Sequence, residues 1–326
     1  MAGQRPFIHW LVYAAVRVIA AVFHMFPIDL NLKTARLMGG IWYRVMARHR
    51  ERARDHLRAA YGSRLSQRRI DAIALRSMQQ MTMMAVECLF TPRLINEWTW
   101  SRYVQLKGID QAVEVLLRRQ GAILVTGHYG NWELVGFTLA ALGFPLVAVM
   151  RPLDNPYLNR YLMAIRARRG LDLLYKKGAS QSAGEILSSG RILAFIADQN
   201  AGRKGLFVDF FGRRASTYKS IGLLAIQHQV PILVGYARRT GERFQYEVGC
   251  NRVIRPDDWA GREDPLLWIT QEYTRAIEEF VRQEPEQYLW IHRRWKSRPP
   301  DETAARSLRT AELAGGLPAA PGPAAG

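Results

Sequence analysis

The sequence predicts an α/β fold, in which helices flank a mixed open sheet and an apolar helix lies at the N-terminus. From residue 121 onwards, short apolar runs end in polar or glycine residues and precede segments with helical periodicity. This alternation is typical of an open, largely parallel sheet. The chain has 326 residues and 48% hydrophobic content, which is enough to bury a large core.

The N-terminal segment predicts a membrane anchor helix over residues 1–30. Residues 7–26 read FIHWLVYAAVRVIAAVFHMF, which is just long enough to span a bilayer, but Arg17 lies near the middle. The helix would therefore either span the membrane shallowly or lie in its interface, and a buried helix is the alternative. Basic residues are dense between positions 33 and 58, which predicts that the rest of the chain lies on the cytoplasmic side.

The main domain is expected over residues 31–299, with a helical lead-in over 31–90. A tail rich in Ala, Gly and Pro follows over 300–326, and we expect it to be disordered. Strands are expected over 121–127, 144–150, 191–198, 205–211, 230–238 and 243–249. Helices are expected over 131–142, 156–169, 181–187, 220–228 and 264–282.

The balance of charge indicates an anionic partner. The chain carries 46 Lys and Arg against 28 Asp and Glu, a net charge of +18, which fits nucleic acid, an acidic carrier protein or an anionic membrane. The two cysteines, Cys88 and Cys250, have neither metal-ligand spacing nor a disulfide framework. We expect both to be reduced core residues, and we expect no metal site.

The stretch TGHYGNWELVG, which begins at Thr126, contains the strongest candidate catalytic residues. His128 follows the first clear strand, where α/β proteins bind ligands, and Glu133 lies in the first turn of the next helix. We expect the turn between them to bring the carboxylate back to the imidazole. A carboxylate on one ring nitrogen fixes the tautomer and makes the other nitrogen a general base. The alternative is a structural histidine beside a glutamate that stabilises a helix N-terminus.

The sequence contains neither a G-x-S-x-G serine elbow nor an H-E-x-x-H zinc motif. A histidine base without its own nucleophile predicts that the nucleophile arrives with a substrate. The base would then activate water, as in a hydrolase, or an acceptor hydroxyl, as in a transferase. A non-catalytic basic protein that binds lipid or nucleic acid is the alternative from another class.

HYGNWE resembles the H-x4-D/E signature of the glycerolipid acyltransferases, in the aromatic-rich form of the bacterial lipid A biosynthesis (lauroyl/myristoyl-type) acyltransferases. Further blocks agree with that family across residues 7–299. They are MRPLDNPYLNRYLMAIRARRG from Met150, ADQN with Asp198, GLFVDFFGRRASTYKS from Gly205, Val230 with Pro231, and PEQYLWIHRRWKSRP from Pro285. One departure is Asp55-His56-Leu57, where the family commonly has Asn-Leu after the early basic helix.

The resemblance implies a glycerolipid acyltransferase-like fold and a membrane-bound O-acyltransferase on the cytoplasmic face of the cell inner membrane. It implies an acyl thioester donor, on an acyl carrier protein or coenzyme A, and a hydroxyl of an anionic glycolipid such as a lipid A precursor as acceptor. It implies no cofactor and no nucleic acid partner. His128 would remove the acceptor proton, and the thiolate would leave readily because a thiol has a pKa of about 8.5.

Two further candidates end predicted strands. Arg151 would hold a phosphate or stabilise the oxyanion, with a surface arginine as the alternative. Asp198 matches the family's DQ block, and we expect it to line the substrate site, with helix capping as the alternative.

The remaining candidate substrate-binding residues are arginines on later segments. Arg166 and Arg169 lie on a predicted helix, where a solvated face is the competing interpretation. Arg293 and Arg294 alternate with tryptophans near the end of the resembling region, which suits a lipid headgroup interface, although nucleic-acid binding has the same composition.

Overall fold

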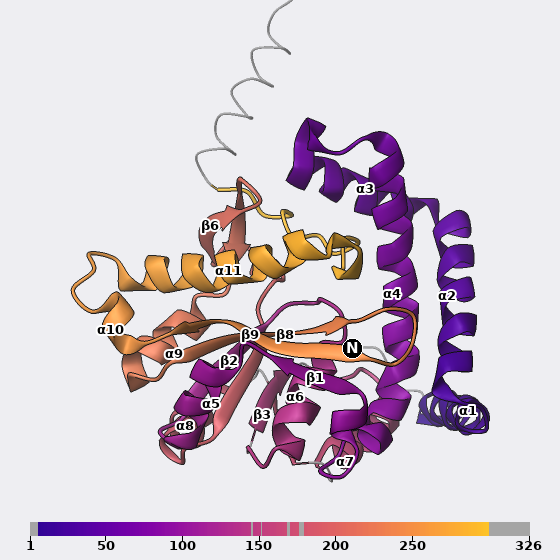
Figure 1. The fold of residues 1–326 in the computed structure, drawn as a ribbon, viewed down its shortest axis with the longest axis horizontal. Coiled ribbons are helices and arrows are strands. Elements are labelled where there is room, and N and C mark those ends of the chain that lie inside the picture. Colours follow the sequence, from indigo (N-terminus) through magenta and orange to yellow (C-terminus); the bar gives the residue numbers. More distant parts are fainter. Residues whose placement is uncertain (1–5, 145, 151, 168–169, 176–178, 300–326) are drawn as a thin grey trace, which may run out of the picture.

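The computed structural model describes residues 6–144, 146–150, 152–167, 170–175 and 179–299. The expected tail over 300–326 lies outside these residues. Within them, a seven-stranded sheet runs in the order β1-β9-β8-β2-β5-β3-β4. Figure 1 shows this sheet with β1, β9, β8, β2 and β3 labelled. Its strands are β1 (Val104–Lys107), β2 (Ala122–Thr126), β3 (Leu146–Met150), β4 (Leu171–Tyr175), β5 (Ile192–Ile196), β8 (Ile232–Arg239) and β9 (Tyr246–Ile254).

The sheet is mixed, as predicted. Its strand pairs are parallel except for β8 and β9, which run antiparallel. The expected strand over 205–211 is present as β6 (Leu206–Phe210), but it pairs with β7 (Arg213–Thr217) in a separate antiparallel hairpin. The expected open α/β sheet flanked by helices is therefore confirmed.

Helices cover both faces of the sheet. Leu124 and its same-face neighbours pack against α5 (Asp110–Leu117) and α6 (Trp132–Ala141), and α7 (Pro156–Ala167) covers the β4 end of that face. Ile123 and Val125 point to the opposite face, because successive strand side chains alternate. That face packs against α8 (Ala179–Ser188), α9 (Ser220–His228) and α11 (Pro265–Gln283), and α10 (Pro256–Trp259) precedes α11.

The expected helical lead-in is a set of helices beside the sheet: α2 (Ile28–Val45), α3 (Ala47–Tyr61) and the 28-residue α4 (Gln67–Leu94). α2 and α4 pack closely at Gly39, where a Cβ atom would lie 2.6 Å from Cα of Gln79. Three short 3-10 turns complete the described elements: Gly62–Arg64, Trp100–Arg102 and Pro285–Gln287.

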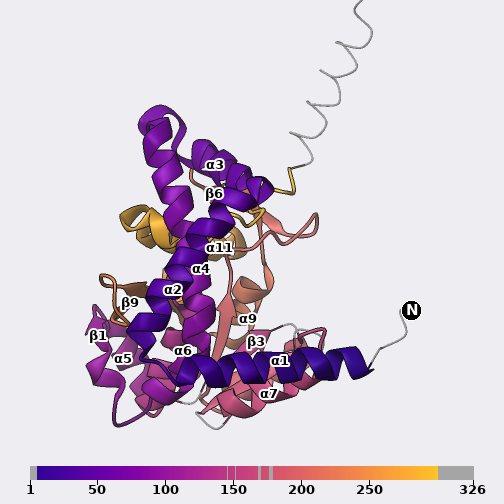
Figure 2. The ribbon, with the colours of Figure 1, turned by 90° about the vertical axis from the view of Figure 1, so that its right-hand side faces the viewer.

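The apolar N-terminal helix α1 (Pro6–His24) lies along α7 on the outside of the domain (Figure 2). The Asn155 side chain donates a hydrogen bond to the carbonyl of His9, and the Arg17 guanidinium lies 4.6 Å from the ring centroid of Tyr161. By length and composition, α1 is the one helix among the described residues that could cross a membrane. Most of its large apolar side chains are exposed, so it is not the buried helix of the alternative interpretation.

Candidate active site

His128 follows β2 on a loop that backbone hydrogen bonds fix. The His128 carbonyl accepts from the Leu289 N–H at 3.0 Å, and the Asn131 N–H donates to the Ala237 carbonyl at 3.1 Å. Gly130 has a φ of +55°, and a Cβ atom there would lie 1.9 Å from the Ala237 oxygen. Only glycine fits this position, so the sequence between His128 and α6 defines where the imidazole lies.

The carboxylate that holds His128 belongs to Asp198. β2 and β5 are neighbouring parallel strands with Thr126 opposite Ile196, so the residues just beyond their carboxyl ends meet. Asp198 Oδ1 lies 2.7 Å from His128 Nδ1, and Asp198 Oδ2 accepts the His128 backbone N–H at 2.8 Å. One carboxylate therefore orients both the ring and the backbone of the histidine.

The Asp198 side chain is almost fully buried. Burial alone would raise the pKa of this carboxyl, but the charge of His128 and its two hydrogen bonds outweigh that effect and lower the pKa to about 2. Asp198 is therefore ionised at neutral pH. An ionised partner at Nδ1 leaves Nε2 of His128 as the nitrogen that can accept a proton.

Two other residues face the His128 ring. The Gln199 side-chain amide lies 3.1 Å from His128 Nε2, where it can donate a hydrogen bond to the free lone pair. The ring of His292 stacks on that of His128 with centroids 5.7 Å apart and planes 8° from parallel. Burial lowers the pKa of His292, and the nearby charges of His128 and Arg294 lower it further, against the opposing effect of Asp198. The second imidazole is thus kept neutral beside the first.

The prediction that Glu133 orients His128 is wrong. The Glu133 carboxylate binds the guanidinium of Arg166 at two points, 2.7 and 3.1 Å, and Nδ1 of His128 is already occupied by Asp198. A fork of two charge-assisted hydrogen bonds from α7 therefore holds Glu133. Glu133 and Arg166 line a cavity together with Trp132, whose ring centroid lies 4.8 Å from that of His128, so the structure brings both predicted residues near the site in another arrangement.

Three other arginines were predicted to bind substrate, and the structure describes one of them. Arg151 and Arg169 lie outside the described residues. Arg293 is exposed, in the segment that carries His292.

The expectation that Arg294 meets a lipid headgroup is wrong. Its side chain is only 2% exposed and donates to the Ser216 carbonyl and the Thr217 hydroxyl, both at 2.6 Å. The neighbouring Trp290 and Trp295 are buried as well, because this segment packs into the core instead of onto a membrane.

A buried polar network lies under the His128 loop, and the sequence analysis did not identify it. Glu87 of α4 is fully buried and accepts hydrogen bonds from Asn131 Nδ2 at 2.9 Å and the Tyr246 hydroxyl at 2.6 Å. The Arg239 guanidinium donates to the same carboxylate. A glutamate in a Met-rich helical run was the available signal, since such a residue is rarely buried without a partner.

His56, at the departure from the family pattern, also lies near the site. Its Nδ1 lies 2.7 Å from the Trp290 carbonyl, two residues before His292. α3 is thereby tied to the segment that places the second imidazole.

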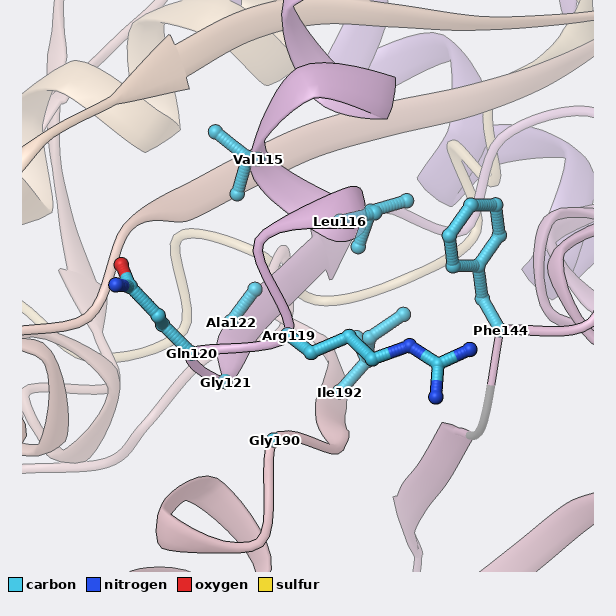
Figure 3. A pocket seen from close by; sticks show the side chains of 9 residues that line it. All are labelled: Val115, Leu116, Arg119, Gln120, Gly121, Ala122, Phe144, Gly190 and Ile192. Carbon is cyan, nitrogen blue, oxygen red and sulfur yellow. The ribbon is translucent and has the colours of Figure 1, made fainter.

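A shallow pocket at the other end of the sheet is not part of this site. It is lined by residues at the amino ends of β2 and β5, including Gly121, Gly190 and Arg119 (Figure 3). His128 lies at the carboxyl ends of the same strands. In the part of the chain that the structure describes, no group of three or more His, Cys, Asp or Glu side chains is arranged to hold a metal ion.

Fold and site define the class: an α/β enzyme with a buried carboxylate–histidine pair at the carboxyl edge of its sheet. Comparison with known proteins identifies the family within this class. The chain belongs to the bacterial lipid A biosynthesis acyltransferase family, whose model matches residues 3–297.

Individual relatives are distant. The chain is 25% identical over 209 residues to the lipid A biosynthesis lauroyltransferase of Escherichia coli (strain K12), which covers 62% of this chain and 66% of the relative. It is 25% identical over 299 residues to the lipid A biosynthesis myristoyltransferase of the same organism, with 90% of this chain and 88% of the relative covered. The palmitoleoyltransferase of that organism is also 25% identical, over 64% of this chain and 68% of the relative.

Proposed function

We propose that the protein is a membrane-bound O-acyltransferase that moves an acyl chain from a thioester onto a hydroxyl of a lipid A precursor. The relatives carry lauroyl, palmitoleoyl and myristoyl transfer to lipid A in their names, and this supports the acceptor class. The observation that carries the mechanism is the bond between His128 Nδ1 and Asp198, which leaves Nε2 as the general base.

In the proposed reaction, the acceptor hydroxyl takes the place of the Gln199 amide at His128 Nε2. The imidazole removes its proton, and the oxygen forms a bond to the thioester carbonyl carbon. The tetrahedral intermediate then collapses, the carbon–sulfur bond breaks, and the imidazolium returns the proton to the thiolate. Asp198 keeps its charge throughout and stabilises the imidazolium, as the aspartate does in serine protease triads.

The donor is an acyl thioester of an acyl carrier protein or of coenzyme A. Both carriers are anionic, and both suit a chain with a net charge of +18. Arg166, and Arg151 and Arg169 by sequence position, are the proposed contacts for phosphates of the donor or the acceptor. Arg293 is the proposed contact at the opposite, α3 side of His128.

The proposed location is the cytoplasmic face of the inner membrane. The support is the exposed apolar surface of α1 together with the basic residues that follow it, including Lys33, Arg44 and Arg48, which are exposed on α2 and α3. The positive charges favour the side of the membrane with anionic headgroups.

The test is mass spectrometry of lipid A from the native host, with the wild-type protein or His128→Ala expressed at equal level. We expect the variant to accumulate a precursor that lacks one acyl chain. His228→Ala, which removes an imidazole from α9 on the other face of the sheet, is the control and should leave the lipid profile unchanged. Unchanged lipid A in the His128 variant would contradict the proposal. Release of free fatty acid with no acylated lipid product would instead indicate a thioester hydrolase that uses the same base.

A further inference from the structure

Two apolar cavities flank α6 on one face of the sheet. The first, which we call the site cavity, lies over β2, β5, β3 and β4 on the side of α7. The second, which we call the back cavity, lies over β1, β9, β8 and β2 on the side of α5. Both are lined by Leu124 of β2 and Val135 of α6, and these two side chains separate them.

The site cavity has a volume of about 150 Å³, and Thr126 in its wall lies two residues before His128. Trp132 lines it, and the Trp132 ring centroid lies 4.8 Å from that of His128. The charged groups in its wall are Glu133 and Arg166, which bind each other near the carboxyl ends of the strands. The deeper wall is formed by aliphatic and aromatic side chains and by Gly136. Apolar cavities of about this size accept small hydrocarbons.

A buried hydroxyl marks the end of the cavity nearest His128. Thr126 is 6% exposed and lines the cavity, and its Oγ1 has no hydrogen-bond partner among the described residues. Buried hydroxyls are normally satisfied, because an unpaired one has lost its hydrogen bonds to water without replacing them. A ligand with a polar atom beside His128 and an apolar remainder in the cavity would satisfy it.

We propose that the site cavity binds the linear hydrocarbon chain of the donor's acyl group, and that Leu124 and Val135 close its inner end and thereby set the chain length. This inference rests on the proposed acyl transfer. The ester end of the chain lies at Thr126 and His128, and the methyl end lies against the wall between the two cavities. Leu124 is two residues further along β2 from the site than Thr126 and points to the same face, about 7 Å deeper.

The back cavity lies directly behind Leu124 and Val135, so these two side chains decide whether an acyl chain can extend into it. It has a volume of about 50 Å³, is almost wholly apolar, and begins where the wall ends. Trimming Val135 would join the two cavities under α6 and give a longer chain more apolar surface to contact. Each additional buried methylene is worth about 0.8 kcal/mol, which is about a fourfold gain in kcat/KM per carbon.

The test uses purified full-length protein and straight-chain acyl-coenzyme A donors that differ in steps of two carbons, with lipid A precursor as acceptor. We expect Val135→Ala to shift the preferred donor to one at least one step longer, with about a fifteenfold gain for that donor relative to the wild-type optimum. Val125→Ala is the matched control, since Val125 is as buried but faces the opposite core. Its length preference should equal that of the wild type.

A narrowing variant tests the site cavity in the other direction. A Cβ atom at Gly136 would lie 2.7 Å from Leu171 Cδ2 and 3.2 Å from Leu146 Cδ2. Both are flexible side-chain ends on the cavity wall, so Gly136→Ala should push them into the cavity and shift the preferred donor one step shorter. Leu124→Val is the milder widening variant if Val135→Ala does not fold.

Thermal stabilisation by free fatty acids of the same lengths supplies a readout that needs no catalysis. An unchanged length preference in the folded Val135, Leu124 and Gly136 variants, with active wild-type enzyme, would overturn the inference and leave the proposed function intact. If the wild type transfers no acyl chain but the fatty-acid length preference still follows the wall variants, the cavity assignment stands and the proposed function fails.

Discussion

Asp198 is the residue on which the geometry of the base depends. It holds the His128 ring and the His128 backbone with separate oxygens, so rotation of the imidazole would break one bond while the other persists. Its low pKa of about 2 means that this arrangement is intact at every pH at which the enzyme is expected to work. The lowered pKa stabilises the folded state. This contribution is fully present when the pH is above the usual pKa of an aspartate, and it is lost as the pH falls toward 2.

Two half-buried histidines predict that the protein loses stability in mild acid. Burial lowers the pKa of both His56 and His292 below 6.5, so below this pH the unfolded chain binds more protons than the folded one. The midpoint of thermal unfolding should fall as the pH is lowered from about 7 toward 5. His292→Gln, which keeps an uncharged polar side chain there, should reduce the fall, by about 2–4 °C for each kcal/mol recovered. An identical pH dependence in the wild type and the variant would show that His292 does not titrate as described.

The sequence predicted which residues lie at the site, but it did not predict which of them contact each other, because those contacts depend on strand order. His128 and Asp198 both follow strands, and both could be assigned to the site on that ground alone. The nearest carboxylate in sequence, Glu133, was the wrong partner, because β2 and β5 pair across about seventy residues of chain and strand order cannot be read from one sequence. The burial of Arg294 was also missed, since an arginine among tryptophans has the same composition at a surface and in a core.

At the scale of elements, α4 supports the active-site loop through Glu87. This carboxylate binds Arg239 of β8, Tyr246 of β9 and Asn131 before α6, and so joins three elements beneath His128. We predict that Glu87→Gln destabilises the protein by about 3–5 kcal/mol, because the buried Arg239 charge loses its partner. Thermal or denaturant unfolding measures the change.

Glu114→Gln is the control for that substitution. Glu114 of α5 pairs with Arg118, the residue that follows this helix, and both side chains are exposed, so we expect a loss of about 0.3–0.5 kcal/mol. A Glu87 variant as stable as the Glu114 variant would show that the network does not hold the loop.

The elements that the sequence predicted best are those with long apolar runs. β2 and β8 are almost wholly buried and β3 and β5 are buried in their first residues, and the expected ranges of these strands contain the observed ones or nearly so. β1 and β7 were missed because VQLK is short and RRAST is polar, and neither shows a clear strand pattern. β4 was not among the expected strands either. It follows α7 after a turn at Gly170 and lies at the edge of the sheet, where only β3 pairs with it.

At the scale of the whole molecule, apolar side chains are exposed mainly on α1 and α2. Leu37, Met38, Ile41 and Val45 form one face of α2, while Leu32, Ala35 and Gly39 pack on the side of α4. An exposed apolar face beside a basic segment is typical of a helix that lies on a membrane surface. The membrane-bound surface proposed for α1 therefore continues onto α2.

We predict that Leu37→Asp weakens binding to vesicles that contain anionic phospholipids by about tenfold or more. The substitution removes about 1.5–3 kcal/mol of apolar burial and adds a charge repelled by the headgroups. Leu117→Asp on α5 is the matched control, since Leu117 is 66% exposed and Leu37 is 63% exposed. Equal vesicle binding of the two variants in a sedimentation assay would place the membrane contact elsewhere.

The central claim, that Asp198 and not Glu133 orients the catalytic imidazole, is tested most directly by NMR of the His128 Nδ1 proton in histidine-labelled protein. His128→Gln assigns the resonance. We predict a strongly deshielded proton in the wild type that persists in Glu133→Gln and disappears in Asp198→Asn, with kcat of the Asp198 variant reduced by about 10³–10⁴. Loss of the resonance in Glu133→Gln and its persistence in Asp198→Asn would contradict this account.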